Sequence, residues 1–148
     1  MADSKRQQIL SAIDTRLKTI KTINGYETNL GNKIYAWKAT PLDDVDLPAA
    51  EYRDIANDHF KPAPIGSFRW ALTIEIGVIT ASGTTTISDI RKMIGDVYKA
   101  IGTDITWSTL AQWTEQPSDK VEIEQQEKTI GGAKIVFQII YDAAKWQC

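Results

Sequence analysis

Hydrophobic residues recur along this chain with two different periods, and the period predicts which segments are strands and which are helices. The clearest pattern covers residues 67–80, where one face carries Phe68, Trp70, Leu72, Ile74, Ile76 and Val78. Strict alternation of this kind predicts a half-buried strand. At about 3.3 Å per residue the strand would span roughly 46 Å. Such a length predicts either a bulge at Gly77 or a projecting hairpin arm, and we favour a projection of the end that leads toward Thr85.

Two other segments have the period of an amphipathic helix. Residues 3–23 place Ile9, Ile13, Leu17 and Ile20 on one stripe. Asp3 or Ser4 is a suitable N-cap for this helix, and Gly25 a suitable stop. Residues 87–101 place Ile87, Ile90, Ile94, Val97 and Ile101 on a second stripe, followed by Gly102. Both stripes predict helices that pack on a core.

The remaining segments complete a sheet. Short strands are expected at residues 33–38 and 50–55, separated by a loop that contains two prolines and three aspartates. Residues 104–115 fit either a helix or a strand. Residues 120–128 and 133–142 are expected to form a hairpin around Gly131 and Gly132. We therefore expect one α+β domain over residues 1–148, with a mostly antiparallel (mixed) sheet of about five strands and two main helices packed on one face.

Composition and charge narrow the class of protein. The chain has 148 residues, 43% of them hydrophobic, and 17 Lys and Arg against 19 Asp and Glu. This balance gives no electrostatic reason to expect nucleic-acid binding. No signal-peptide pattern and no stretch long and apolar enough to cross a membrane is evident. With a single cysteine, Cys148, the expectation is a protein made in a reducing cytoplasm, without a membrane partner.

The sequence contains few candidates for chemistry. Asp43, Asp44 and Asp46 could hold a hard cation, but the spacing of an EF-hand loop is absent, so a solvated acidic loop is the better interpretation. The single histidine, His59, has no nucleophile placed beside it by any motif, and no phosphate-binding glycine loop occurs. We expect no catalytic site, no metal and no cofactor. An acidic contact for a basic partner is the remaining interpretation of the aspartates.

The order of short motifs along the chain resembles a known family. The first predicted helix ends in Ile23-Asn24-Gly25-Tyr26, and Thr28-Asn29-Leu30-Gly31 precedes the first strand. Leu47-Pro48 precedes the second strand, the long strand and second helix follow, and the last strand ends in Ile140-Tyr141. In this order the chain resembles the tail terminator (tail completion, minor tail) proteins of long-tailed bacteriophages and prophages. The polar segment after Leu47-Pro48 departs from the aliphatic strand usual in that family.

The resemblance implies a non-enzymatic subunit of a six-fold ring, assembled in the cytoplasm of the bacterial host and located in the virion tail. Such a ring caps the tail tube, ends its polymerisation and offers a surface to the head-tail connector protein. The expected partners are further copies of the chain, the tail tube protein and the connector, with no sequence-specific nucleic acid. Alternatives are another phage neck or tail subunit (a head-closure or tube protein) or a small-molecule binding module. From exposure and shape we expect contacts at the acidic loop and at the end of the long strand: Asp43, Asp44, Asp46, Val78, Ile79, Thr80, Ser82, Thr84 and Thr85.

Overall fold

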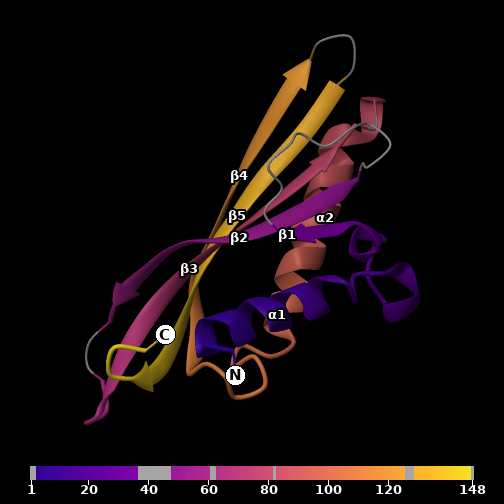
Figure 1. The fold of residues 1–148 in the computed structure, drawn as a ribbon. Helices are drawn as coiled ribbons and strands as arrows, with labels where there is room; N and C mark the ends of the chain where they lie inside the picture. Colours follow the sequence, from indigo (N-terminus) through magenta and orange to yellow (C-terminus); the bar gives the residue numbers. More distant parts are fainter. Residues whose placement is uncertain (1–2, 37–47, 61–62, 82, 126–128, 148) are drawn as a thin grey trace.

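Within the described residues, five strands form one mixed sheet with the spatial order β1-β2-β3-β5-β4 (Figure 1). The strands are β1 (Ile34–Ala36), β2 (Ala49–His59), β3 (Ser67–Thr80), β4 (Trp113–Gln125) and β5 (Thr129–Ala144). β1 pairs with β2 in parallel, and the other three pairings are antiparallel. The computed structural model describes residues 3–36, 48–60, 63–81, 83–125 and 129–147. The expected α+β fold is confirmed.

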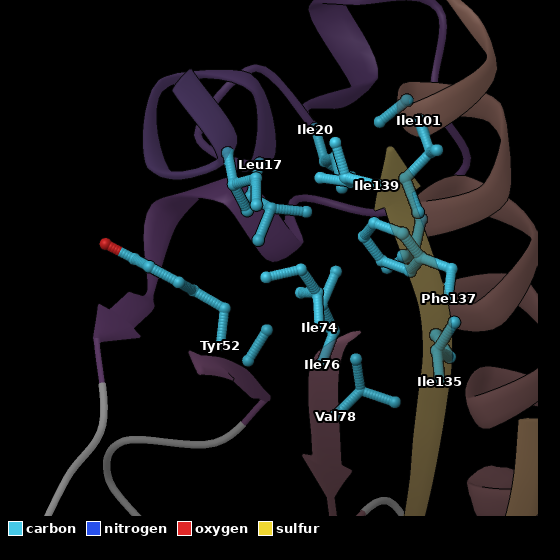
Figure 2. Packing of buried hydrophobic residues seen from close by; sticks show 14 of the residues in the cluster. Leu17, Ile20, Tyr52, Ile74, Ile76, Val78, Ile101, Ile135, Phe137 and Ile139 are labelled. Carbon is cyan, nitrogen blue, oxygen red and sulfur yellow. The ribbon is translucent and has the colours of Figure 1, made fainter. Parts of the chain in front are cut away.

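Two helices, α1 (Lys5–Leu17) and α2 (Thr86–Gly102), lie on the same side of this sheet (Figure 1). Figure 2 shows the layer between them, where Ile74, Ile76 and Val78 of β3 point toward the helices beside Ile135, Phe137 and Ile139 of β5. The alternate residues of both strands are thus the core, as the period of two predicts. Burial of these aliphatic side chains is the main stabilising term of the fold.

The first helix is shorter than its hydrophobic stripe. α1 ends at Leu17, although Ile20 beyond it is fully buried. The carbonyl of Ile20 accepts a hydrogen bond from the Gly31 N–H at 2.7 Å. A Cβ on Gly31 would lie 2.5 Å from the Lys18 carbonyl oxygen, so only glycine allows this close approach. The chain therefore leaves the helix in order to pack against the segment before β1.

That segment is tied to α2 by a buried carboxylate. Asp96 of α2 is 3% exposed and accepts hydrogen bonds from Glu27 N (3.1 Å), Thr28 N (2.8 Å) and Thr28 Oγ1 (2.6 Å). Lys99 Nζ, also on α2, donates to the Gly25 carbonyl at 2.8 Å, where Gly25 has a φ of 91°. Two of the motifs that carry the family resemblance, at residues 23–26 and 28–31, thus contribute residues that fix the connection between α1 and β1.

Residues 104–112, which fit either a helix or a strand, form turns, and β4 begins at Trp113. Asp104 holds these turns, since its carboxylate accepts hydrogen bonds from Thr106 Oγ1 (2.6 Å), Thr106 N (2.9 Å) and Ser108 N (2.8 Å). These bonds lower the pKa of Asp104 to about 2. Trp107 lies fully inside, and the Arg16 guanidinium stacks 3.8 Å from its ring centroid. Trp107 is thus a core residue that comes from a turn and not from a helix or a strand.

The expected turn at Gly131 and Gly132 is wrong. Both glycines lie inside β5, where they pair with Thr80 and Ile79 of β3. A Cβ on Gly131 would lie 2.4 Å from Thr86 Cγ2, so the glycine is needed for α2 to pack closely on the strand. The two-glycine pattern therefore marks close packing of a helix on a strand.

The expected projection of β3 is at the wrong end. Val78 is fully buried and pairs with Ala50 on one side and Ala133 on the other. The register of β3 is also continuous through Gly77, so that glycine makes no bulge. The end that extends past the helices is the other one, where β3 begins and β5 ends (Figure 1). Hydrophobic residues alternate at both ends of β3, so the pattern does not tell the two ends apart. The end that leads into α2 is the one that the helix covers.

Candidate interaction surface

One face of the sheet is covered by no described helix, and we call it the open face. It carries the odd-numbered positions of β3 and the even-numbered positions of β5, together with alternate residues of β2 and β4. The principal side chains on it are Glu51, Arg53, Trp113, Lys120 and Glu122 on the outer strands and Arg69, Glu75, Ile79, Lys134 and Asp142 on the central two. This face carries the candidate site.

A carboxylate lies at the centre of the open face. Glu75 is 8% exposed, and its Oε2 is 2.7 Å from the Arg53 guanidinium, which comes from the paired position on β2. Its other oxygen, Oε1, is 3.8 Å from Lys134 Nζ on β5. Two cations from the flanking strands thus compensate one carboxylate that is largely removed from water.

A hollow of about 430 Å³ opens beside this carboxylate. Its floor includes Gly77 of β3 and Gly132 of β5, and Ile79 and Ile130 stand on it as apolar walls. Glu51 and Glu122 line it from the two outer sides of the sheet. The hollow exists because two central strands carry glycine on the open face at neighbouring positions.

The far end of the open face is aromatic. The rings of Phe60 and Trp113 meet edge to face at 5.8 Å, and the Arg69 guanidinium lies 5.4 Å from the Trp113 ring centroid. Arg69 donates two hydrogen bonds to Asp142 on β5, at 2.6 and 2.9 Å. This bidentate bond raises the pKa of the Arg69 guanidinium. The ion pair and the rings brace the part of the sheet that extends past the helices.

A second aromatic cluster lies on the helix side of the same extended end. Phe68 contacts Trp70 at 5.9 Å and Trp146 at 5.2 Å between ring centroids, and Trp146 is 86% exposed. His59, the sequence candidate for a general base, packs 5.1 Å from the Phe68 ring. His59 therefore packs in an aromatic cluster with Phe68 and Trp70.

The residues expected to contact partners are not brought together as one surface. Asp43, Asp44, Asp46 and Ser82 lie outside the described residues. Val78 and Thr80 are buried on the helix side of β3 and offer no surface. Ile79 is half-buried on the wall of the hollow, and Thr84 and Thr85 are exposed at the start of α2. Contact of these last three with a partner stays a prediction.

Sequence reasoning missed the central carboxylate and the hollow. Glu75 and Gly77 stand on the polar side of the alternating strand, which is the signal that could have found them. What the sequence did not give is the register that places Arg53 and Lys134 beside Glu75. Among the described residues, no group of three or more His, Cys, Asp or Glu side chains is arranged to hold a metal ion. None of the described helices combines the length and apolarity needed to cross a membrane.

Similarity to known proteins is found among solved structures. No family model matches the chain. No curated protein matches it either. Among solved structures, it is similar to a chain described as "Virion of native gene transfer agent (GTA) particle", with a TM-score of 0.47 and 12% identity over 90% of this chain and 93% of that chain. At these values the similarity concerns the general path of the chain and does not bear on function.

Proposed function

We propose that this protein is a structural subunit of a phage or prophage virion that forms a ring on the end of the tail tube. The ring ends tube polymerisation and presents a surface to the head-tail connector. Its partners are further copies of the chain, the tube protein and the connector. The protein assembles in the host cytoplasm and is then part of the virion tail. The protein acts by binding, without catalysis or a cofactor.

The observation that carries this proposal is the structural role of the motifs that resemble tail terminators. Gly25, Thr28 and Gly31 each make a contact that holds the segment between α1 and β1 against the rest of the domain. These motif residues therefore support the proposal as residues on which the connection between α1 and β1 depends in this chain.

The open face supports assembly of several copies. A subunit of a closed ring needs two different contact surfaces, one for each neighbour. This domain presents two chemically distinct sides, the outer surface of its helices and the open face with its hollow. The central charges of the hollow are compensated within the chain by Arg53 and Lys134, which suits a surface for protein contact.

Light scattering behind size-exclusion chromatography, over a concentration series and with negative-stain images of the largest species, tests the proposal. We expect a finite ring of about six copies that binds the end of preassembled tail tubes. Open-ended filaments would identify a tube protein instead, and rings that bind only the head-side connector would identify a head-closure protein. A chain that stays monomeric both alone and in the presence of tail tubes would refute the proposal.

A further inference from the structure

β4 is an edge strand whose outer side meets no other strand of the described residues. In the sheet order β1-β2-β3-β5-β4 it pairs with β5 alone. From the outer side, no backbone group in the described part of the chain bonds to residues 118–125. Every second residue of such a strand points its backbone N–H and C=O groups away from the sheet. This row of unpaired groups is a template for a further strand.

The part of this edge that is open to pairing is short and bounded at both ends. The β4–β5 register shifts between Glu115 and Ser118, and Pro117 within this shift has no N–H to donate. At the other end the strand stops at Gln125. The midpoint of residues 117–125 is Val121, which is 43% exposed on the helix side of the sheet. An antiparallel strand of the same length would therefore be centred on Val121.

A second copy of β4 fits this edge in one register. When two antiparallel copies are centred on Val121, Lys120 of each lies opposite Glu122 of the other, and the two Val121 residues lie opposite each other. A shift of two residues would set Lys120 against Lys120 or Glu122 against Glu122. A shift of one residue would set helix-side positions against open-face positions. In the centred register Pro117 lies opposite Gln125, at the end of the ladder, where no N–H is needed.

The charges on this edge select the register and do not identify the partner. Within one chain Lys120 Nζ lies 3.9 Å from Glu122 Oε1, and the two side chains are 78% and 59% exposed. An ion pair as exposed as this contributes little to the monomer. In the centred register each of the two charges also faces an opposite charge on the other copy. A second copy is identified by the unpaired backbone, by the matching length and by the apolar residue at the centre.

We propose that two copies of the chain pair antiparallel through residues 118–124 of β4, across a two-fold axis at Val121, so that their sheets join into one. The contact uses the same surface on both chains and therefore joins two chains only. It is independent of the proposed ring, whose neighbours meet through unlike surfaces. The pairing covers the exposed Val121 side chain and the outward backbone groups of both edges.

Disulfide cross-linking at Val121 tests this contact. In Val121→Cys, made in a Cys148→Ser background, the Cα atoms of the two cysteines would lie about 4.5–5.5 Å apart, within the range of a disulfide. Ser118→Cys is the matched control, because Ser118 is also exposed on β4 but lies roughly 20 Å from its copy, which pairs with residue 124. Oxidised glutathione is the oxidant, and the two-chain covalent species is measured under denaturing conditions. Urea unfolding of the reduced variants checks that each chain is folded.

We expect Val121→Cys to cross-link at least tenfold faster than Ser118→Cys. Adding either Lys120→Glu or Glu122→Lys to Val121→Cys should slow the reaction at least tenfold, because like charges then face each other. An equimolar mixture of these two double variants should restore the rate, because opposite charges face each other again in the mixed pair. Light scattering of Lys120→Glu and Glu122→Lys, alone and mixed, repeats the test without a cysteine.

Equal rates for Val121→Cys and Ser118→Cys would overturn the pairing, as would a mixture that reacts no faster than its components. Rings of about six copies without the cross-link would overturn the pairing and leave the proposed ring standing. Cross-linked pairs that form no rings, on or off tail tubes, would refute the ring alone. If added tail tubes protect the thiol of Val121→Cys from a maleimide and no cross-link forms, the edge belongs to the tube protein, and the pairing is overturned.

Discussion

Replacement of Asp96 by alanine should destabilise the domain far more than the same change elsewhere on the same helix. The Asp96 carboxylate accepts three hydrogen bonds from the segment before β1, two of them from the backbone N–H groups of Glu27 and Thr28. After Asp96→Ala the threonine hydroxyl can turn to water, but both N–H groups lose their acceptor. They are only partly buried, so each costs about 1–1.5 kcal/mol, or about 2–3 kcal/mol in all. For a domain of this size that corresponds to a melting temperature lower by roughly 4–12 °C.

Urea unfolding followed by circular dichroism, at a concentration where the chain is monomeric, measures this loss. Asp89→Ala is the matched control, because Asp89 lies on α2 and accepts one exposed hydrogen bond from the Thr85 hydroxyl. Asp89→Ala raises helix propensity as much as Asp96→Ala does, but it also removes a favourable negative charge from the first turn of α2. We therefore expect it to change the free energy of unfolding by about 0.5 kcal/mol or less. If Asp96→Ala loses no more stability than Asp89→Ala at an unchanged m-value, the carboxylate does not hold the α1–β1 connection.

Three further predictions concern packing and titration. Gly131→Ala should cost about 1–3 kcal/mol in urea unfolding, because its Cβ would lie 2.4 Å from Thr86 Cγ2, whereas Gly132→Ala on the open face should be nearly neutral. Burial, and to a smaller extent the hydrogen bond to Asp14, raise the pKa of Tyr52 to about 12. The unfolding free energy should therefore fall as the pH rises from about 10 to about 12, and it should fall less steeply in Tyr52→Phe. Equal slopes in the two proteins would show that titration of Tyr52 does not contribute to this pH dependence. The pKa of Asp104 is lowered to about 2 by its bonds from Thr106 and Ser108, so its stabilisation is lost as the pH falls from about 4 to about 2, and Asp104→Asn should be less acid-sensitive in that range.

The sequence predicts best those elements whose two faces differ most. The bounds of β3 agree with the alternation over residues 67–80, and α2 differs from its expected range by one residue at each end. α1 ends earlier than its stripe because Ile20 is buried from a turn, through a backbone contact with Gly31 that has no counterpart in hydrophobic period. The expected hairpin is confirmed by the antiparallel pairing of β4 with β5, and only its turn is wrongly placed. Glycine serves both turns and close packing, and the position of Thr86 above Gly131 separates the two.

The candidate surface is harder to predict, because it depends on strand register. Arg53 and Glu75 are 22 residues apart in sequence, and they form a pair only because β2 and β3 align these two positions. Likewise, Gly77 and Gly132 create a hollow only when β3 and β5 lie side by side. Polar positions on a strand indicate that one face of the sheet is exposed. They carry no information about which residues of the adjacent strands lie beside them.

The two faces of β3 contribute differently to the stability of the domain. Ile76 is fully buried among the core residues, whereas the next residue, Gly77, faces the hollow. Ile76→Ala should therefore cost about 2–5 kcal/mol of unfolding free energy, because it leaves a cavity in a packed core. Gly77→Gln should leave urea unfolding nearly unchanged, because a Cβ at Gly77 would meet nothing within 4 Å. If instead Gly77→Gln unfolds the domain as Ile76→Ala does, both sides of β3 serve the core, and the glycine is there for packing within the chain.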